Sequence, residues 1–207
     1  MRRALWLFAG LCLSRTALAQ SAPRIEVSPT VGYLWGGNLW DRTTEGPDAS
    51  VGDHLDYGLR AGWLASPRWE FEFDWTRVPT RVEFSPFLPA VPLDIDFLTP
   101  RVAYHFLTGA LRPYVAAGLG AGIFETPAGS NGYFTLTFAA GVKAFLTPNL
   151  GARIEARGFG TGVGDTPLGF PCTELVAGAP GDTVEPVSCA NDFMFSGDVT
   201  AGIVVAF

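Results

Sequence analysis

The chain has 207 residues, of which 48% are apolar, and its formal net charge is −6. This length is sufficient for a single domain. The acidic balance argues against a nucleic-acid-binding protein, because contacts to a phosphate backbone require an excess of Lys and Arg. Mean hydropathy is positive, yet no apolar run after residue 19 approaches the roughly 18 residues of a membrane helix.

Residues 1–19 predict a secretory signal peptide. Met1-Arg2-Arg3 is a basic start, Ala4–Leu13 is an apolar run too short to span a bilayer, and Ala17-Leu18-Ala19 is a small-x-small cleavage site. Cys12 is interpreted as apolar filler, because the preceding leucine is too bulky for a lipoprotein signal. Cleavage would leave residues 20–207 as one domain with a net charge of −9.

Two cysteines remain after cleavage, Cys172 and Cys189, in a stretch rich in Gly and Pro. An even number of cysteines in an exported protein predicts a disulfide, although two free thiols or a metal site would use the same residues. In the entropic model, closing such a loop would restrict the unfolded chain by about 3 kcal/mol.

Apolar and polar residues alternate in the first half of the mature chain, which predicts β-strands. Strands are expected at 24–35 and 54–63, joined by a polar connection at 36–51, and a tight turn at 65–68 follows. The clearest strand is 69–76, where four apolar and four polar residues alternate: Trp69, Phe71, Phe73 and Trp75 against Glu70, Glu72, Asp74 and Thr76. Such a strand needs apolar surroundings on one side and a polar interior on the other, which a soluble β-sandwich does not provide.

The second half continues this pattern. A Pro-rich connection at 78–92 precedes a strand at 93–107, whose alternation changes phase and predicts a β-bulge at 97–100. The remaining expected segments are a turn at 108–110, a strand at 111–123, a polar loop at 125–132, a strand at 134–146, a turn at 147–149, a strand at 150–164, a long connection at 165–191 and a closing strand at 192–207.

Eight strands with alternating short and long connections predict an all-β fold, an eight-stranded antiparallel transmembrane β-barrel. The short turns and both termini are expected on the periplasmic side, and the four longer connections outside. An interior of eight strands is narrow enough to be filled by side chains.

Thirteen charged residues are expected to face this interior: Glu26, Asp56, Arg60, Glu70, Glu72, Asp74, Arg101, Arg112, Lys143, Arg153, Glu155, Arg157 and Asp198. They predict a salt-bridged plug, because unpaired charges in a narrow lumen are costly. A gated or ion-relay lumen, or a small ligand cavity beside Gly118, Gly120 and Gly122, remains an alternative.

The segment Arg112–Gly120, RPYVAAGLG, resembles the R-P-Y-V-x-x-G-x-G strand of small outer-membrane β-barrel domains of the OmpA-like and OmpX-like kind. The resemblance implies a location in the cell outer membrane and a terminal Phe207 that the outer-membrane insertion machinery recognises. Several members have structural, adhesion or stress roles.

We therefore expect a monomer in contact with outer-membrane lipid and lipopolysaccharide, with a structural or surface-interaction role and no catalysis, metal or cofactor. The alternative function is a narrow channel or carrier for small or hydrophobic compounds. A lipid-modifying barrel enzyme is the rival class, but neither His54 nor His105 is followed two residues later by Ser. Acidic outer loops would bind divalent ions or simply be solvated. Six aromatic residues are expected to anchor the barrel at the membrane interfaces: Tyr33, Trp35, Trp63, Trp69, Trp75 and Tyr104.

Overall fold

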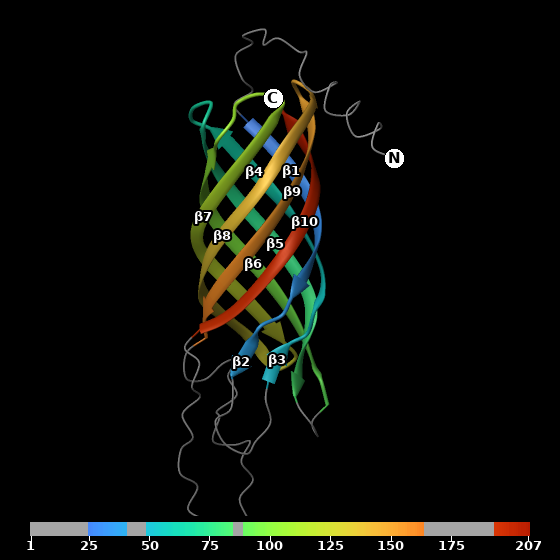
Figure 1. Ribbon diagram of the computed structural model, residues 1–207. Coiled ribbons are helices and arrows are strands. Elements are labelled where there is room, and N and C mark those ends of the chain that lie inside the picture. The colour runs from blue at the N-terminus through green and yellow to red at the C-terminus, as the bar shows by residue number, and fades with distance from the viewer. Residues whose placement is uncertain (1–24, 41–48, 85–88, 164–192) are drawn as a thin grey trace, which may run out of the picture.

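The structure is a computed structural model and describes residues 25–40, 49–84, 89–163 and 193–207. Its regular elements in these ranges are strands (Figure 1). None of the described residues belongs to a helix long and apolar enough to cross a membrane. The strands are β1 (Ile25–Trp35), β2 (Asn38–Trp40), β3 (Ala49–Val51), β4 (His54–Leu64), β5 (Trp69–Phe84), β6 (Val91–His105), β7 (Leu111–Thr126), β8 (Gly129–Thr147), β9 (Leu150–Gly162) and β10 (Phe193–Ala206).

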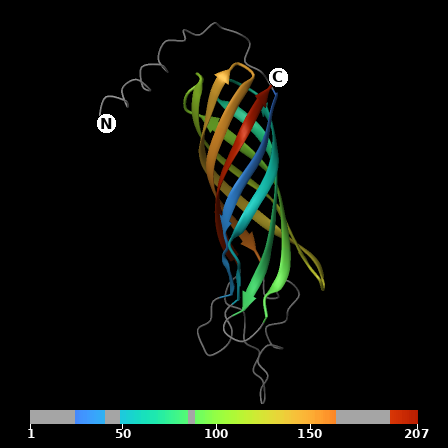
Figure 2. The same ribbon diagram turned by 90° about the vertical axis from the view of Figure 1, so that its right-hand side faces the viewer.

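Eight of these strands form a closed antiparallel barrel in the order β1-β4-β5-β6-β7-β8-β9-β10. β10 pairs with β1 from Glu26↔Ala206 to Trp35↔Gly197 and closes the sheet, and Figure 2 shows β1 between β10 and β4. The backbone N–H of Phe207 donates to the carbonyl of Ile25 at 2.9 Å. The predicted all-β, eight-stranded antiparallel barrel is confirmed.

The two faces of the barrel wall differ in polarity because successive side chains of a strand point to opposite faces. On β5, the side chains of Trp69, Phe71 and Phe73 lie on the outer face and are about half exposed, at 50%, 49% and 49%. Between them, Glu70 and Glu72 face the interior and are buried. The wall is therefore apolar outside and charged inside, as the sequence predicts.

Short turns join neighbouring strands at the end of the barrel that carries the C-terminus (Figure 1). The hydroxyl of Ser66 accepts a hydrogen bond from the Trp69 N–H at 3.1 Å, and the hydroxyl of Thr147 accepts one from the Leu150 N–H at 3.0 Å. These side chains replace ladder partners that the turns cannot supply. The three predicted tight turns are confirmed.

At the opposite end, the strands are longer than predicted. The expected connection at 78–92 is largely strand, because β5 and β6 remain paired as far as Val82↔Val91. The expected connection at 36–51 contains β2 and β3, and β3 pairs with β5. The expected loop at 125–132 is wrong, since β7 and β8 form a tight hairpin that ends at Thr126↔Gly129, where Gly129 has a φ of 154°.

The predicted bulge at 97–100 is also wrong. The β5–β6 register is unbroken from Trp69↔Tyr104 to Val82↔Val91, and the β6–β7 pairing keeps the same register on both sides of Pro100. Odd-numbered residues of β6 face the interior along the whole strand. The hydrophobic phase changes because the interior changes from charged to apolar along the barrel.

Candidate functional site: the barrel interior

The interior contains two zones. A charged zone occupies the half nearer the C-terminal end, and an apolar zone occupies the half nearer β2 and β3. The strands cross both zones, so the chemistry of each inward row changes along its length. On β6, for example, Arg101 and His105 lie in the charged zone, while Leu93, Ile95 and Phe97 lie in the apolar zone.

Glu155 lies at the centre of the charged zone. Its carboxylate accepts hydrogen bonds from both terminal nitrogens of Arg101, at 2.9 and 3.0 Å, and lies 3.1 Å from Nη2 of Arg60. Arg153 donates to it at 2.9 Å, and the Tyr114 hydroxyl donates at 2.5 Å. Two parallel N–H donors from one guanidinium fix the orientation of a carboxylate as well as neutralising it.

Toward the C-terminal end, the main cation is Lys143. Its ammonium group donates to Glu26 at 2.7 Å and to Glu70 at 2.6 Å. Nε2 of His105 lies 2.7 Å from the same Glu70 carboxylate, while its Nδ1 has no hydrogen-bond partner among the described residues. Arg112 reaches Glu26 at 3.4 Å from the rim of the barrel. This layer joins the central network through Glu72, which binds Arg101 and Arg153.

The layer next to the apolar zone is built around Arg157. Its guanidinium donates to Asp74 at 2.6 Å and forms a two-point ion pair with Asp198. Asp56 is the exception, because neither of its carboxylate oxygens has a hydrogen-bond partner in the described part of the chain. Its nearest cationic atom is Nη2 of Arg157, at 3.9 Å.

The structure places all thirteen predicted lumen residues in the interior and links them by ion pairs. Arg112 is the least buried, with 12% of its side chain exposed, and Asp56 has the weakest contact. The predicted ionic network did not include Tyr114, although the alternation placed this residue on the inward row between Arg112 and Ala116. It also omitted Thr76 and Thr200, which accept hydrogen bonds from Arg157 and Arg60.

The three inward glycines of β7 do not border an open ligand cavity. A Cβ atom at Gly118 would lie 2.5 Å from Cβ of Arg101, and one at Gly120 would lie 2.0 Å from the carbonyl oxygen of Leu98. A Cβ at Gly122 would meet the ring of Phe124 at 2.9 Å. These glycines let β7 approach β6 closely and leave room for the long side chains beside them.

The apolar zone is a packed aromatic and aliphatic cluster. The rings of Phe97 and Phe159 stack with centroids 4.4 Å apart, and Phe124 meets Phe97 edge to face at 6.3 Å. Leu34 and Met194 pack in the same cluster and are fully buried. None of these residues was predicted as part of a site.

The six predicted interfacial aromatics lie on the outer face in two groups. Trp63, Trp69 and Tyr104 lie near the short turns, where the Trp69 and Tyr104 rings are 4.9 Å apart. Tyr33, Trp35 and Trp75 lie toward the other end. The predicted disulfide residues Cys172 and Cys189, and the predicted signal peptide, lie outside the described residues.

No protein-family model and no curated protein matches the chain. Among solved structures, it is similar to the crystal structure of Neisserial surface protein A, with a TM-score of 0.59 and 16% identity over 88% of this chain and 97% of that chain. It is similar to the crystal structure of the outer membrane protein OprG from Pseudomonas aeruginosa, with a TM-score of 0.58 and 12% identity over 90% of this chain and 96% of that chain.

A third similar structure is that of the outer membrane protein AlkL, determined by solid-state NMR in DMPC lipid bilayers. Its TM-score is 0.57, with 17% identity over 94% of this chain and 97% of that chain. The chain therefore has the fold of the small eight-stranded outer-membrane β-barrels.

Proposed function

We propose that the chain is an outer-membrane β-barrel protein with a structural or surface-interaction role and an interior closed by its own side chains. The observation that carries this proposal is the reversal of the usual polarity. Large apolar side chains cover the outer face, while arginines, a lysine and carboxylates fill the inside. Only apolar surroundings make such an outer face favourable, and the closed sheet pairs the backbone of each strand with two neighbouring strands.

The outer face also supports a position for the bilayer. The aromatic row of β5 ends at Trp75, and the next outward residue on that strand is Arg77. Arg77 forms ion pairs with Asp94 at 2.8 Å and Asp96 at 2.9 Å, both on the outward side of β6. Charged groups of this kind belong in water or among head groups, so the outer boundary of the bilayer lies between Trp75 and Arg77.

In this placement, the short turns and both termini are periplasmic after cleavage of residues 1–19. Phe207 at the periplasmic rim is the residue that the insertion machinery recognises, and the outer half of the aromatic face contacts lipopolysaccharide. The protein acts as a monomer. These assignments are supported by the short turns that lie together at the C-terminal end of the barrel and by the resemblance of the β7 sequence.

Two barriers in series along the barrel favour a closed interior rather than a narrow channel. An ion would first have to displace the salt-bridged network around Glu155 and then cross the apolar cluster around Phe97. Moving an ion into apolar surroundings without a partner costs many kcal/mol. Residues of the cluster such as Phe97 and Phe124 are no more than 1% exposed. A structural role without catalysis also fits His105, whose ring is held against the Glu70 carboxylate.

Location and orientation are testable by cysteine labelling of intact cells. In a Cys172→Ser, Cys189→Ser background, Ala128→Cys places a thiol in the β7–β8 turn and Gly109→Cys places one in the β6–β7 turn. A membrane-impermeant maleimide should label Ala128→Cys in intact cells and Gly109→Cys only after the outer membrane is opened. The reverse pattern, or recovery of the protein outside the outer-membrane fraction, would contradict the proposal.

Closure of the interior is testable with liposomes. Vesicles containing the protein should swell in isotonic arabinose no faster than vesicles reconstituted without it. Rapid swelling with small sugars that slows as the sugar becomes larger would instead support the channel alternative.

A further inference from the structure

A hollow lies in the barrel wall beyond the proposed bilayer boundary, where β4 separates from β5. The β4–β5 pairing ends at Tyr57↔Arg77, and β5 then pairs with β3 from Val51↔Val82. The two registers differ by one residue, so the segment between Val51 and Tyr57 contains one residue more than β5 contains between Arg77 and Val82. Such bulges redirect side chains and occur often beside binding sites.

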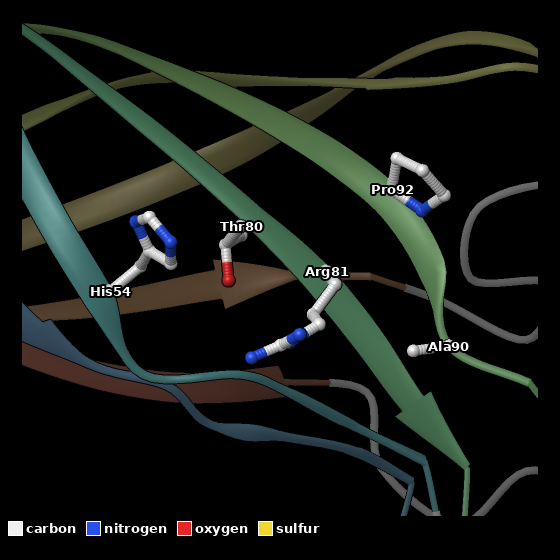
Figure 3. Close-up of a pocket in the computed structure, with 5 residues that line it drawn as sticks. All are labelled: His54, Thr80, Arg81, Ala90 and Pro92. Atoms are coloured by element: carbon white, nitrogen blue, oxygen red, sulfur yellow. The ribbon is translucent and has the colours of Figure 1, made fainter.

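Three hydrogen bonds hold this bulge in place. The Gly52 N–H donates to the carbonyl of Arg81 at 2.8 Å, and the Thr80 hydroxyl donates to the carbonyl of Gly52 at 2.6 Å. The carboxylate of Asp53 accepts a hydrogen bond from the Gly36 N–H at 2.9 Å. The hollow is therefore preformed. Its volume is about 340 Å³, and it is lined by His54, Thr80, Arg81, Ala90 and Pro92 (Figure 3).

The polar side of the hollow consists of the side chains of His54, Thr80 and Arg81. Figure 3 shows the His54 imidazole, the Thr80 hydroxyl and the Arg81 guanidinium directed toward the same space. Because Thr80 already donates its proton to Gly52, the donors available to a ligand are His54 and Arg81. The opposite side, at Ala90 and Pro92, is apolar.

These two side chains have unused hydrogen-bonding capacity. Arg81 pairs with Glu83 through Nε at 3.1 Å, and neither of its terminal nitrogens has a partner among the described residues. The His54 ring makes no hydrogen bond within the described part of the chain. By contrast Arg77, the nearest arginine along β5, is held by Asp94 and Asp96.

We propose that this hollow binds a phosphate or sulfate group between the His54 imidazole and the terminal nitrogens of Arg81. The planar guanidinium matches two oxygens of such an anion, and the imidazole supplies a further N–H donor from the other side. The apolar wall at Ala90 and Pro92 packs against the body of the molecule that carries the anion. Glu83 competes with this ligand for Arg81, and Asp53 adds a further negative charge next to His54.

The anion has two possible sources, a phosphorylated lipid head group of the surrounding leaflet or a free phosphorylated or sulfated solute. The choice between these two sources rests on the proposed membrane placement, whereas the binding of the anion by His54 and Arg81 does not depend on it. The first experiment therefore uses the purified full chain in detergent micelles. Inorganic sulfate is the probe, and the backbone amide signals of Gly52, Asp53 and Arg81 are followed by NMR.

Sulfate should shift these signals in a saturable way. His54→Gln and Arg81→Gln should each weaken binding by about tenfold, because each removes one charge-assisted contact. The matched control Arg77→Gln should leave binding unchanged, and Glu83→Gln should strengthen it several-fold by freeing Arg81. Absence of a saturable shift, or equal binding in wild type, His54→Gln and Arg81→Gln, would overturn the site and leave an adventitious ion only.

A second experiment identifies the source. The protein is reconstituted in phosphatidylcholine vesicles with and without lipopolysaccharide, and the same amides are followed by solid-state NMR. A head-group ligand predicts shifted signals with lipopolysaccharide alone and no further change with sulfate. A free solute predicts signals that lipopolysaccharide leaves unchanged and that sulfate still shifts. Failure of the membrane placement would alter this second result but not the titration in detergent.

Discussion

Replacement of Glu155 by Gln removes the central negative charge of the interior while keeping the size and shape of the side chain. Glu155 lies 3.1 Å from Arg60, 2.9 Å from Arg101 and 2.9 Å from Arg153, and the side chains of all four residues are at most 1% exposed. In the variant, three buried guanidinium groups would surround a neutral amide. Because these side chains are buried, the three positive charges would lose their central counter-charge away from bulk solvent.

Breaking a buried ion pair by removing one partner costs about 3–5 kcal/mol. We expect Glu155→Gln to lower the free energy of unfolding by an amount in this range. The double variant Arg101→Gln/Glu155→Gln restores the charge balance, so its loss should be smaller than the sum of the two single losses by about 1–3 kcal/mol. Arg101→Gln alone leaves Glu72 and Glu155 each without one cation.

The measurement is urea-induced unfolding in phosphatidylcholine vesicles, with the folded fraction taken from the mobility of unheated protein in electrophoresis. Glu83→Gln is the control, because it breaks an ion pair whose partners are 60% and 52% exposed, and it should cost less than about 1 kcal/mol. If Glu155→Gln cost no more than Glu83→Gln, or if the Arg101 and Glu155 losses were additive, the reasoning would be refuted.

Three further predictions use the same unfolding assay or mass measurement. Phe97→Ala should cost about 3–5 kcal/mol, because it removes a stacked ring from the fully buried apolar zone; a loss below about 1 kcal/mol would mean that this zone is loosely packed. Gly120→Ala should cost about 1–3 kcal/mol, because its Cβ would lie 2.0 Å from the Leu98 carbonyl oxygen. The matched change Gly158→Ala meets nothing within 4 Å and should be neutral or stabilise by up to about 1 kcal/mol; equal effects at the two glycines would count against the close β6–β7 approach. Alkylation of unfolded protein without reductant should add no label at Cys172 and Cys189, and a mass gain of two labels would exclude the disulfide.

The fold was predictable because one strand carried an unambiguous pattern. Four aromatic residues alternate with three carboxylates between Trp69 and Thr76, and only a barrel wall between apolar surroundings and a polar interior accommodates both. Strand parity then assigned each charged residue to a face, which is why the lumen residues could be selected without coordinates. Asp198, for example, faces inward and meets Arg157.

The pairing of these charges was only partly predictable, because some partners face each other on neighbouring strands, as Arg157 and Asp198 do, whereas others come from strands that are not neighbours. Arg101 on β6 binds Glu155 on β9, and two other strands separate them in the wall. Nothing in the alternation indicates which charges meet across the lumen. The alternation also does not show that Asp56 has no hydrogen-bond partner among the residues that the structure describes.

The apolar zone was missed for a different reason. Beyond Trp75, the outer face becomes charged and the inner face becomes apolar, so the hydrophobic phase reverses while the register continues. Sequence reasoning attributed this reversal in β6 to a bulge near Pro100. The same reversal, together with prolines such as Pro79 and Pro92, made the outer extensions of β5 and β6 resemble a connection.

Ion conductance across planar lipid bilayers tests the closed interior most directly. Purified, folded protein inserted into the bilayer should leave the current at the baseline of the protein-free membrane over the range of voltages at which the bilayer is stable. Steady single-channel steps of reproducible size would contradict a lumen closed by the Glu155 network and the Phe97 cluster.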